Sequence, residues 1–280
     1  MAVGLNFRDL LNVLGMYPGD PGPPGSDCAC VAVSAYGGDA LCVRAGDSLL
    51  GLLAGALGTR ALGASEMLPP KPVAVSYESA ATVPTVYSTV DAALRGVRGV
   101  RGASCVLVHS AAGGIGLAAS QLLSCAGSAA VSTCGSSGKR ALLRSLHVHC
   151  SVGSRGTQFA ELLCAPSRAS LGVSMVLNSL TSPGMVAASL SALSACGVLA
   201  ELGKRDVWCA SAVCSERRDV SHALVALDFL PAAGSGRGLM ALSCALARGG
   251  VRALPHGTFS LGRVPRALRV MSQARHDTTS

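Results

Sequence analysis

The stretch Cys105-Val106-Leu107-Val108-His109-Ser110-Ala111-Ala112-Gly113-Gly114-Ile115-Gly116 decides the fold of this chain. A short apolar run meets a turn of small residues, and a helix-like segment follows from Leu117 to Cys125. Residues Ala111 to Gly116 fit the looser form of the dinucleotide fingerprint, with alanine at the first glycine position. Small residues let the backbone approach a pyrophosphate there, and the helix N-terminus supplies N–H donors. An ordinary glycine-rich turn in an α/β core has the same appearance, so the flanking sequence has to separate the two.

Strand-like and helix-like segments alternate from this turn to Leu202. The expected strands are Cys105–His109, Ala129–Thr133, Val148–Val152, Val173–Leu177 and Gly197–Leu202. The expected helices between them are Ile115–Cys125, Lys139–Leu146, Gln158–Ala165 and Met185–Leu193. This alternation predicts a parallel, doubly wound sheet. Because such a fold binds a pyrophosphate after its first strand, we expect a nucleotide site at Ala111 to Gly116.

The remaining sequence predicts shorter elements, and residues 1–83 are rich in turns and mainly β. A break is expected at Pro84-Thr85, before a helix at Val86–Arg95, and a Gly-Gly pair is expected to end a helix after Arg248. The expected elements are a helix at Phe7–Leu14, strands at Cys28–Ala35 and Ser48–Leu52, a short helix starting near Ser76, and helices at Leu239–Arg248 and Val264–Ala274.

The composition of the 280 residues narrows the class of protein. This length is enough for two modest domains or one large one, and a sizeable core can form because half of the residues are hydrophobic and 14% are charged. The net charge is +8, but the basic residues are scattered and only 3% of residues are aromatic. We therefore expect a basic surface or a preference for anionic ligands, rather than nucleic acid binding. Two uncharged tracts, Ala103–Gly138 and Ala169–Ala200, are interrupted by polar and turn residues, so they predict buried strand–helix units and no membrane span.

The 12 cysteines lack the dense, regular spacing of a disulfide scaffold. Most lie among apolar or small residues, which predicts free thiols in a reducing, cytoplasmic compartment. Cys28 and Cys30 form a C-x-C pair, yet no second pair and no nearby histidine completes a zinc set. We therefore expect no metal site.

The segment after the second expected strand indicates which dinucleotide is bound. A site that prefers NAD places an acidic residue about 20 residues past the glycines, for the ribose 2′-hydroxyl. No Asp or Glu occurs from Leu117 to Ala160, and Ser136, Lys139 and Arg140 lie there instead. A 2′-phosphate requires hydroxyl donors and cations, so NADPH is the expected cofactor. The alternative is that Lys139 and Arg140 only begin a solvated helix.

Several dispersed segments together resemble the enoyl reductase domain of type I polyketide synthases. That domain is similar to animal fatty acid synthase enoyl reductase and to quinone oxidoreductases, in the zinc-independent branch of the medium-chain dehydrogenase/reductase superfamily. The segments run along nearly the whole chain in order: Gly4-Leu5-Asn6-Phe7-Arg8-Asp9, Gly15-Met16-Tyr17-Pro18-Gly19, Ser110 to Gly116, Val176-Leu177-Asn178-Ser179-Leu180, Glu201-Leu202-Gly203-Lys204, and Met271-Ser272-Gln273-Ala274-Arg275-His276.

The resemblance implies an α/β protein with a Rossmann doubly wound parallel sheet and a GroES-like, mainly β substrate lobe. The expected substrate lobe is residues 1–83, completed by 252–280, and the expected Rossmann domain is 84–251. Further strands flank this region in the family, so the lobe is expected to be truncated at both ends. The implied activity is NADPH-dependent reduction of a trans-2-enoyl thioester on an acyl carrier protein, in polyketide or fatty acid synthesis. Other synthase domains are the implied partners.

Site residues follow from the same resemblance. Lys204 and Asp228 match the pair proposed for proton delivery, although a salt bridge between them is an equally simple interpretation. Asn6, Thr89 and Asn178 match positions that line the cofactor, with ordinary hydrogen bonding as the alternative. The pyrophosphate turn consists of Ala112, Gly113, Gly114, Ile115 and Gly116. His109 and His256 are expected to be structural.

Two other functions share these sequence features. One is a quinone or small-enone oxidoreductase of the same superfamily, which uses the same hydride chemistry. The other is a degenerate dinucleotide-binding domain without catalytic activity, which the shortened ends favour.

Overall fold

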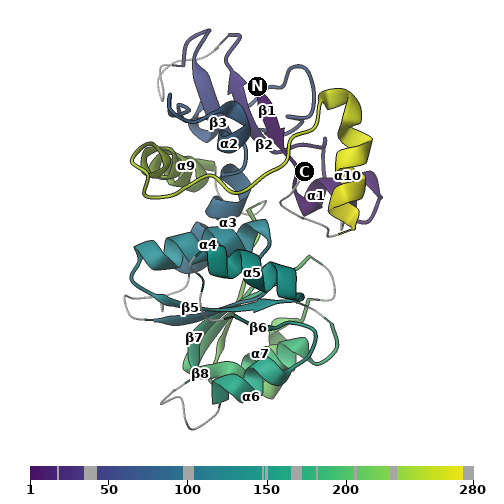
Figure 1. The fold of residues 1–280 in the computed structure, drawn as a ribbon, viewed down its shortest axis with the longest axis vertical. Helices are drawn as coiled ribbons and strands as arrows, with labels where there is room; N and C mark the ends of the chain where they lie inside the picture. The colour runs from purple at the N-terminus through teal and green to yellow at the C-terminus, as the bar shows by residue number, and fades with distance from the viewer. Residues whose placement is uncertain are drawn as a thin grey trace. The chain divides into compact units, whose positions relative to one another are not determined.

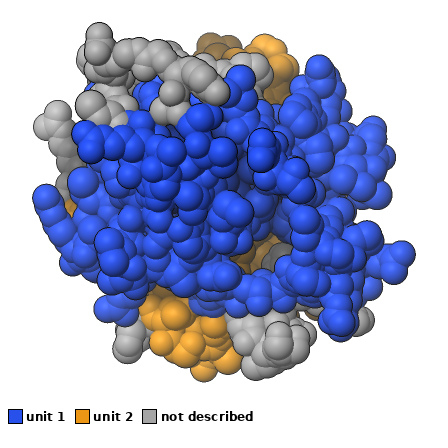
Figure 2. Space-filling model, turned by 90° about the horizontal axis from the view of Figure 1, so that it is seen from above, with its two compact units in different colours: residues 1–88, 227–280 blue, residues 89–226 orange. Residues whose placement is uncertain are grey.

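Residues 1–17, 19–34, 43–96, 104–146, 148, 151–164, 172–180, 182–204, 207–227 and 232–273 are described by the structure, a computed structural model. The chain divides into two compact units, shown in different colours in Figure 2. Unit 1 consists of residues 1–88 and 227–280, and unit 2 consists of residues 89–226.

Unit 2 is built on a parallel sheet with the strand order β6-β5-β4-β7-β8-β9. The chain starts in the middle at β4, adds two strands on one side, and then returns to add three on the other. This is the doubly wound order, and it confirms the predicted parallel sheet. The strands are β4 (Cys105–Val108), β5 (Ala129–Cys134), β6 (Ser151–Gly153), β7 (Val173–Asn178), β8 (Leu193–Glu201) and β9 (Ser221–Leu224).

Helices cover both faces of this sheet. Figure 1 shows α4 (Gly114–Cys125) and α5 (Ser137–Ser145) on one face, with α6 (Gln158–Cys164) and α7 (Met185–Ala192) on the other. The central strands are therefore buried on both sides, as their nearly continuous apolar sequence predicts. Leu107, Val176 and Leu199 at the centre of the sheet are fully buried.

Two elements of unit 2 were absent from the sequence prediction, namely α8 (Ala210–Glu216) and β9. The first is a seven-residue helix in which only Val213 is buried, so its apolar period is too weak to recognise. The second has the sequence Ser-His-Ala-Leu and lies at the edge of the sheet, without a buried residue. It is a strand because β8 provides a paired neighbour, which local sequence does not reveal.

Unit 1 contains an antiparallel sheet in the order β1-β2-β3. Its elements are β1 (Ala2–Gly4), α1 (Phe7–Val13), β2 (Asp27–Val31), β3 (Ser48–Leu52), η1 (Ser65–Met67), α2 (Tyr77–Ala80), α9 (Ala232–Ala247), η3 (Leu261–Arg263) and α10 (Val264–Ser272). Helix α1 packs against α10. Ser76 caps α2 by accepting a hydrogen bond from the Ser79 N–H at 3.1 Å.

The helix α3 (Pro84–Gly96) begins two residues earlier than expected. Pro84-Thr85 was expected to end the helix that starts near Ser76, and α2 does end before it, at Ala80. The pair itself belongs to α3, since proline is tolerated in the first turn of a helix because that N–H needs no intrahelical partner. The Thr85 N–H donates instead to the Asp27 carboxylate at 2.8 Å.

The boundary near the C-terminus differs from the expected one, which assigned residues up to 251 to the Rossmann domain. Residues from Leu227 onward belong to unit 1. The reason is packing, because α9 lies against η1 and Ser243 Oγ donates to the Pro70 carbonyl at 2.5 Å. Of the described helices, none has both the length and the apolar character that a bilayer span requires.

Candidate dinucleotide and active site

The turn after β4 is held in place by its own backbone. The His109 N–H donates to the Leu177 carbonyl at 3.1 Å, and the Ala111 N–H donates to the Thr133 carbonyl at 2.9 Å. Ser110 has a left-handed φ of 52°, and the Gly113 N–H closes the turn onto its carbonyl at 2.8 Å. The turn therefore lies at the carboxyl ends of β4, β5 and β7, where the strand order reverses. Open α/β sheets bind ligands at this switch point.

Gly116 shows why this turn requires small residues. A Cβ atom at Gly116 would lie 2.3 Å from Ala111 Cα and 2.5 Å from the Ala111 carbonyl oxygen, both backbone atoms. Gly113 precedes α4 without a side-chain cap, and the first N–H groups of a helix have no intrahelical acceptor. Gly113, Gly114 and Ile115 are partly or fully exposed. These residues fit a pyrophosphate that accepts hydrogen bonds from the first turn of α4.

The end of β5 leads into a second helix start at the same edge of the sheet. Ser136 caps α5, because its Oγ accepts from the Lys139 N–H at 3.3 Å and its carbonyl accepts from the Arg140 N–H at 3.1 Å. Burial raises the pKa of the neighbouring Cys134 thiol, and the positive charges of Arg140 and Lys139 oppose that shift. The expected residues Ser136, Lys139 and Arg140 thus lie beside one another at the carboxyl end of β5.

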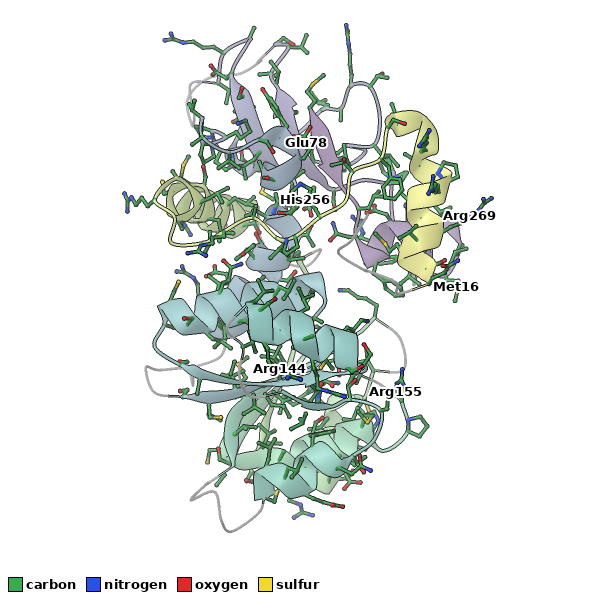
Figure 3. The ribbon with its side chains drawn as sticks, viewed as in Figure 1. Met16, Glu78, Arg144, Arg155, His256 and Arg269 are labelled. Atoms are coloured by element: carbon green, nitrogen blue, oxygen red, sulfur yellow. The ribbon has the colours of Figure 1, made fainter. Side chains whose placement is uncertain are left out.

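Arg155 lies next to this helix start, and the sequence prediction did not include it. Cys134 of β5 pairs with Gly153 of β6, and the Ser154 N–H donates to the Cys134 carbonyl at 3.1 Å. A Cβ atom at Gly135 would lie 4.0 Å from Arg155 Nε. Figure 3 labels Arg155 in the loop after β6, and Arg144 on α5. Arg155 could have been proposed from the sequence, because it follows the third expected strand and the end of that strand meets the end of β5.

Asn178 and Glu201 join the ends of β7 and β8. Asn178 Nδ2 donates to Glu201 Oε2 at 2.6 Å, and Asn178 Oδ1 accepts from the Leu180 N–H at 3.2 Å. Glu201 Oε1 accepts from the Gly203 N–H at 2.6 Å. Burial raises the pKa of Glu201, and the hydrogen bonds from Asn178 and Gly203 oppose the shift. Lys204, which is half-buried, follows this turn directly.

His109 is part of the core of unit 2. Its Nε2 lies 2.8 Å from Ser189 Oγ, and its Nδ1 lies 3.0 Å from Thr133 Oγ1. Ser189 Oγ donates its proton to the Met185 carbonyl at 2.7 Å, so it accepts from His109 Nε2–H, and Thr133 donates to Nδ1. Burial lowers the pKa of His109 to about 4. The imidazole is therefore neutral and structural, as the sequence predicts.

Asn6 belongs to unit 1, where both its backbone and its amide are hydrogen-bonded. The Asn6 N–H donates to Asp9 Oδ2 at 2.8 Å, and Asn6 Nδ2 donates to Asp27 Oδ2 at 2.9 Å. Burial raises the pKa of Asp27 to about 7, although hydrogen bonds from Thr85 and Asn6 oppose that shift. This buried network fixes the start of α1 on β2.

The remaining residues expected from the sequence are Thr89, Asp228 and His256. Thr89 is buried in α3. Asp228 lies outside the described residues. His256 Nδ1 lies 2.9 Å from the Leu254 carbonyl, and Figure 3 shows His256 near Glu78 of α2.

Unit 2 brings together the turn at Ala112 to Gly116, the α5 start, Asn178 and Lys204 at the carboxyl end of its sheet. Within the described ranges, no group of three or more His, Cys, Asp or Glu side chains is arranged to hold a metal ion.

Comparisons with known proteins agree with this architecture. A family model described as zinc-binding dehydrogenase matches residues 146–277. Erythronolide synthase EryA2 of Saccharopolyspora erythraea is 36% identical over 282 residues, which cover 98% of this chain and 8% of that protein. The chain thus spans a small part of this curated relative.

Solved structures are similar over nearly the whole chain. The crystal structure of CurK enoyl reductase is 32% identical with a TM-score of 0.88, covering 98% of this chain and 86% of that one. Mycobacterial Rv1454c, solved in complex with NADPH, shares the fold at 21% identity and a TM-score of 0.85, covering 97% of this chain and 86% of that one. With its sheet order, its glycine turn and these relatives in agreement, the chain belongs to the enoyl reductase domains of type I polyketide synthases, an oxidoreductase family of the medium-chain dehydrogenase/reductase superfamily.

Proposed function

We propose that this domain uses NADPH to reduce the α,β double bond of a trans-2-enoyl thioester. The proposed substrate is carried on an acyl carrier protein that serves neighbouring synthase domains. The observation that carries the proposal is the carboxyl edge of the parallel sheet. It combines an uncapped glycine turn, a cationic helix start and a lysine on an ordered turn. Membership of the enoyl reductase family supports the choice of reaction.

The cofactor would be held by two groups of residues in unit 2. In the turn at Ala112 to Gly116, the backbone N–H groups of Gly114, Ile115 and Gly116 would bind the pyrophosphate, because they open the twelve-residue helix α4. Ser136, Lys139, Arg140 and Arg155 would bind the 2′-phosphate. The absence of any carboxylate between Leu117 and Ala160 supports NADPH over NADH, since nothing there would repel the phosphate. Asn6 and Thr89 are proposed for the nicotinamide region on the strength of the family resemblance.

The reaction needs a hydride donor, a site for transient negative charge and a proton donor. When bound, the nicotinamide would supply the hydride that adds to the β-carbon. The Lys204 ammonium would then stabilise the enolate-like thioester and deliver a proton to the α-carbon. Asp228 is proposed as the residue that orients this lysine on the strength of the family resemblance alone. A lysine suits this role because its charge acts over several geometries on a flexible stem.

Steady-state kinetics test the proposal. The rate of cofactor oxidation is measured with a crotonyl-pantetheine thioester and, separately, with a quinone. Each substrate is assayed once with NADPH and once with NADH. We expect the thioester with NADPH to be the best pair. A clear preference for the quinone would support the alternative oxidoreductase, and a lack of NADPH binding would support a degenerate domain.

K204A is expected to lower kcat by about 10² or more. An unchanged kcat in that variant would exclude Lys204 as the proton donor.

A further inference from the structure

The carboxyl ends of β7 and β8 are tied together by side chains as well as by the sheet ladder. Asn178 is the register partner of Glu201, and the Leu202 N–H donates to the Asn178 carbonyl at 2.8 Å. Their side chains add the 2.6 Å bond from Asn178 Nδ2 to Glu201 Oε2. Asn178 is 0% exposed and Glu201 is 1% exposed, so this bond is shielded from water. Such shielding makes a charge-assisted hydrogen bond stronger than it would be at the surface.

The Glu201 carboxylate also fixes the next turn of the chain. Its second oxygen accepts from the Gly203 N–H, two residues ahead, at 2.6 Å. Gly203 is the residue directly before Lys204, so this bond holds the peptide that carries the lysine. On the other side, Asn178 Oδ1 accepts from the Leu180 N–H at 3.2 Å. Three hydrogen bonds in series therefore connect the turn after β7 with the turn after β8.

A buried carboxylate is a costly way to join two strands. Desolvation penalises the charge, and apolar residues of similar size often stabilise a protein as well as a buried polar pair does. The Asn178–Glu201 pair lies at the carboxyl end of the sheet, where the glycine turn is also found, and Glu201 is followed by the turn that leads to Lys204. A positioning role would account for a carboxyl group buried at this place.

We propose that Asn178 and Glu201 act as positioning residues, whose hydrogen-bonded pair orders the Gly203 turn and thereby holds Lys204 for its role in reduction. This inference rests on the proposed function of Lys204. It assigns the Asn178 amide to an interaction within the protein, in place of the direct cofactor contact expected from the family resemblance. Glu201 gains a role that neither its position in the motif nor its residue type had indicated.

An exchange of the two functional groups tests the pair. E201Q replaces one acceptor oxygen by an NH₂ donor, which then faces either the Asn178 amide or the Gly203 N–H. The double variant N178D/E201Q restores the whole series. The new amide at position 201 donates to the new carboxylate at position 178 and accepts from Gly203, while the carboxylate accepts from Leu180. The double variant thus moves the charge across the pair and keeps all three hydrogen bonds.

Three measurements are made on the full chain: kcat and KM with the crotonyl-pantetheine thioester, NADPH affinity by fluorescence, and amide hydrogen exchange of the peptide containing residues 201–204. E201Q is expected to lower kcat about tenfold and to change the NADPH Kd by less than about twofold. Its 201–204 peptide should exchange faster. N178D/E201Q should recover kcat to within about threefold of the wild type, with slow exchange restored.

R217A provides a matched control at the opposite end of β8. Arg217 donates to the carbonyls of Leu190 and Leu193, at 2.9 and 3.3 Å. Its loss should lower the melting temperature of unit 2 and leave kcat close to wild type. If E201Q shows only the R217A pattern, the positioning role is wrong and the pair is merely structural.

The remaining outcomes separate this inference from the proposed function. If E201Q does not fold, N178D/E201Q decides alone, because a folded double variant with normal NADPH binding and low kcat contradicts the positioning role. If K204A loses activity while E201Q keeps it, the reaction stands and the positioning role falls. If the wild type reduces no enoyl thioester, the proposed function falls. Hydrogen exchange that accelerates in E201Q and recovers in the double variant would then still support the ordering of the turn.

Discussion

Gly116 is the residue at which the cofactor turn is most sensitive to substitution. G116A would place a methyl group against the backbone of Ala111, which cannot move without opening the turn. We expect a loss of about 2–3 kcal/mol in unfolding free energy and a weaker NADPH affinity. Chemical denaturation and a fluorescence titration measure the two effects.

Gly138 is a control for that variant, because a Cβ atom there meets nothing within 4 Å. G138A in α5 should be neutral or should stabilise the protein by up to about 1 kcal/mol, since alanine favours the helix. Equal effects of the two substitutions would mean that close packing at Gly116 does not shape the turn.

Arg155 is expected to discriminate between the two dinucleotides. R155A removes a cation beside the α5 start, so the NADPH Kd should rise roughly tenfold or more while the NADH Kd stays nearly constant. Isothermal calorimetry with both nucleotides measures this ratio. R218A removes an exposed arginine elsewhere in unit 2 and should leave the ratio unchanged. A parallel loss of affinity for NADH and NADPH in R155A would rule out contact with the 2′-phosphate.

His109 makes the stability of unit 2 depend on pH. The unfolded chain binds a proton to this residue near its ordinary pKa of 6.5, whereas the folded unit binds it only near 4. Stability is therefore lost as the pH falls from 6.5 toward 4, by about 3 kcal/mol in total. Urea unfolding at pH 7 and pH 5 should show a loss of about 2 kcal/mol in the wild type relative to H109Q.

The Asp27 carboxyl group of unit 1 makes stability depend on pH in the opposite direction to His109. Its raised folded pKa of about 7 means that stability is lost as the pH rises from 3.8 toward 7. This contribution is common to the wild type and H109Q, so it cancels in the comparison between them. Identical pH dependence in the two proteins would show that His109 is not held neutral.

Close packing of α9 on η1 stabilises unit 1. Gly236 of α9 faces η1, and a Cβ atom there would lie 2.6 Å from the Glu66 carbonyl oxygen. G236A should therefore push α9 away from η1 and cost about 1–3 kcal/mol. Gly234, two residues earlier, has nothing within 4 Å of its Cβ position, so G234A should be neutral or slightly stabilising. Thermal melting compares the two, and an equal effect would exclude tight packing of α9 on η1.

The elements that could be predicted from the sequence are those with a strong local signal. The strands β4, β5, β7 and β8 and the helix α4 have continuous apolar runs or small-residue turns, and their positions followed from these features. The four-residue edge strand β9 was missed, because its pairing with β8 has no local signature. The helix α9 was found in part, but its membership of unit 1 depends on contacts with η1 that are distant in sequence.

The prediction of site residues from the sequence was also limited to those with a local signal. Ser136, Lys139 and Arg140 could be proposed because they follow a predicted strand at a recognisable spacing. Arg155 and the Asn178–Glu201 pair depend on which strand ends lie next to one another. That information resides in the register of the sheet. Spacing along the chain therefore predicted the nucleotide turn and the start of α5, but not Arg155 or the Asn178–Glu201 pair.

At the scale of the whole molecule, the chain combines an antiparallel unit with a doubly wound unit, and it matches a small part of a large polyketide synthase. The proposed function requires transfer of a hydride from NADPH to the β-carbon of an enoyl thioester. The test is mass spectrometry and NMR of the product formed with NADPH in which both C4 hydrogens are replaced by deuterium. We expect a saturated thioester with one deuterium at the β-carbon and a solvent-derived proton at the α-carbon. An unreduced thioester, in the presence of a folded protein that binds NADPH, would contradict it.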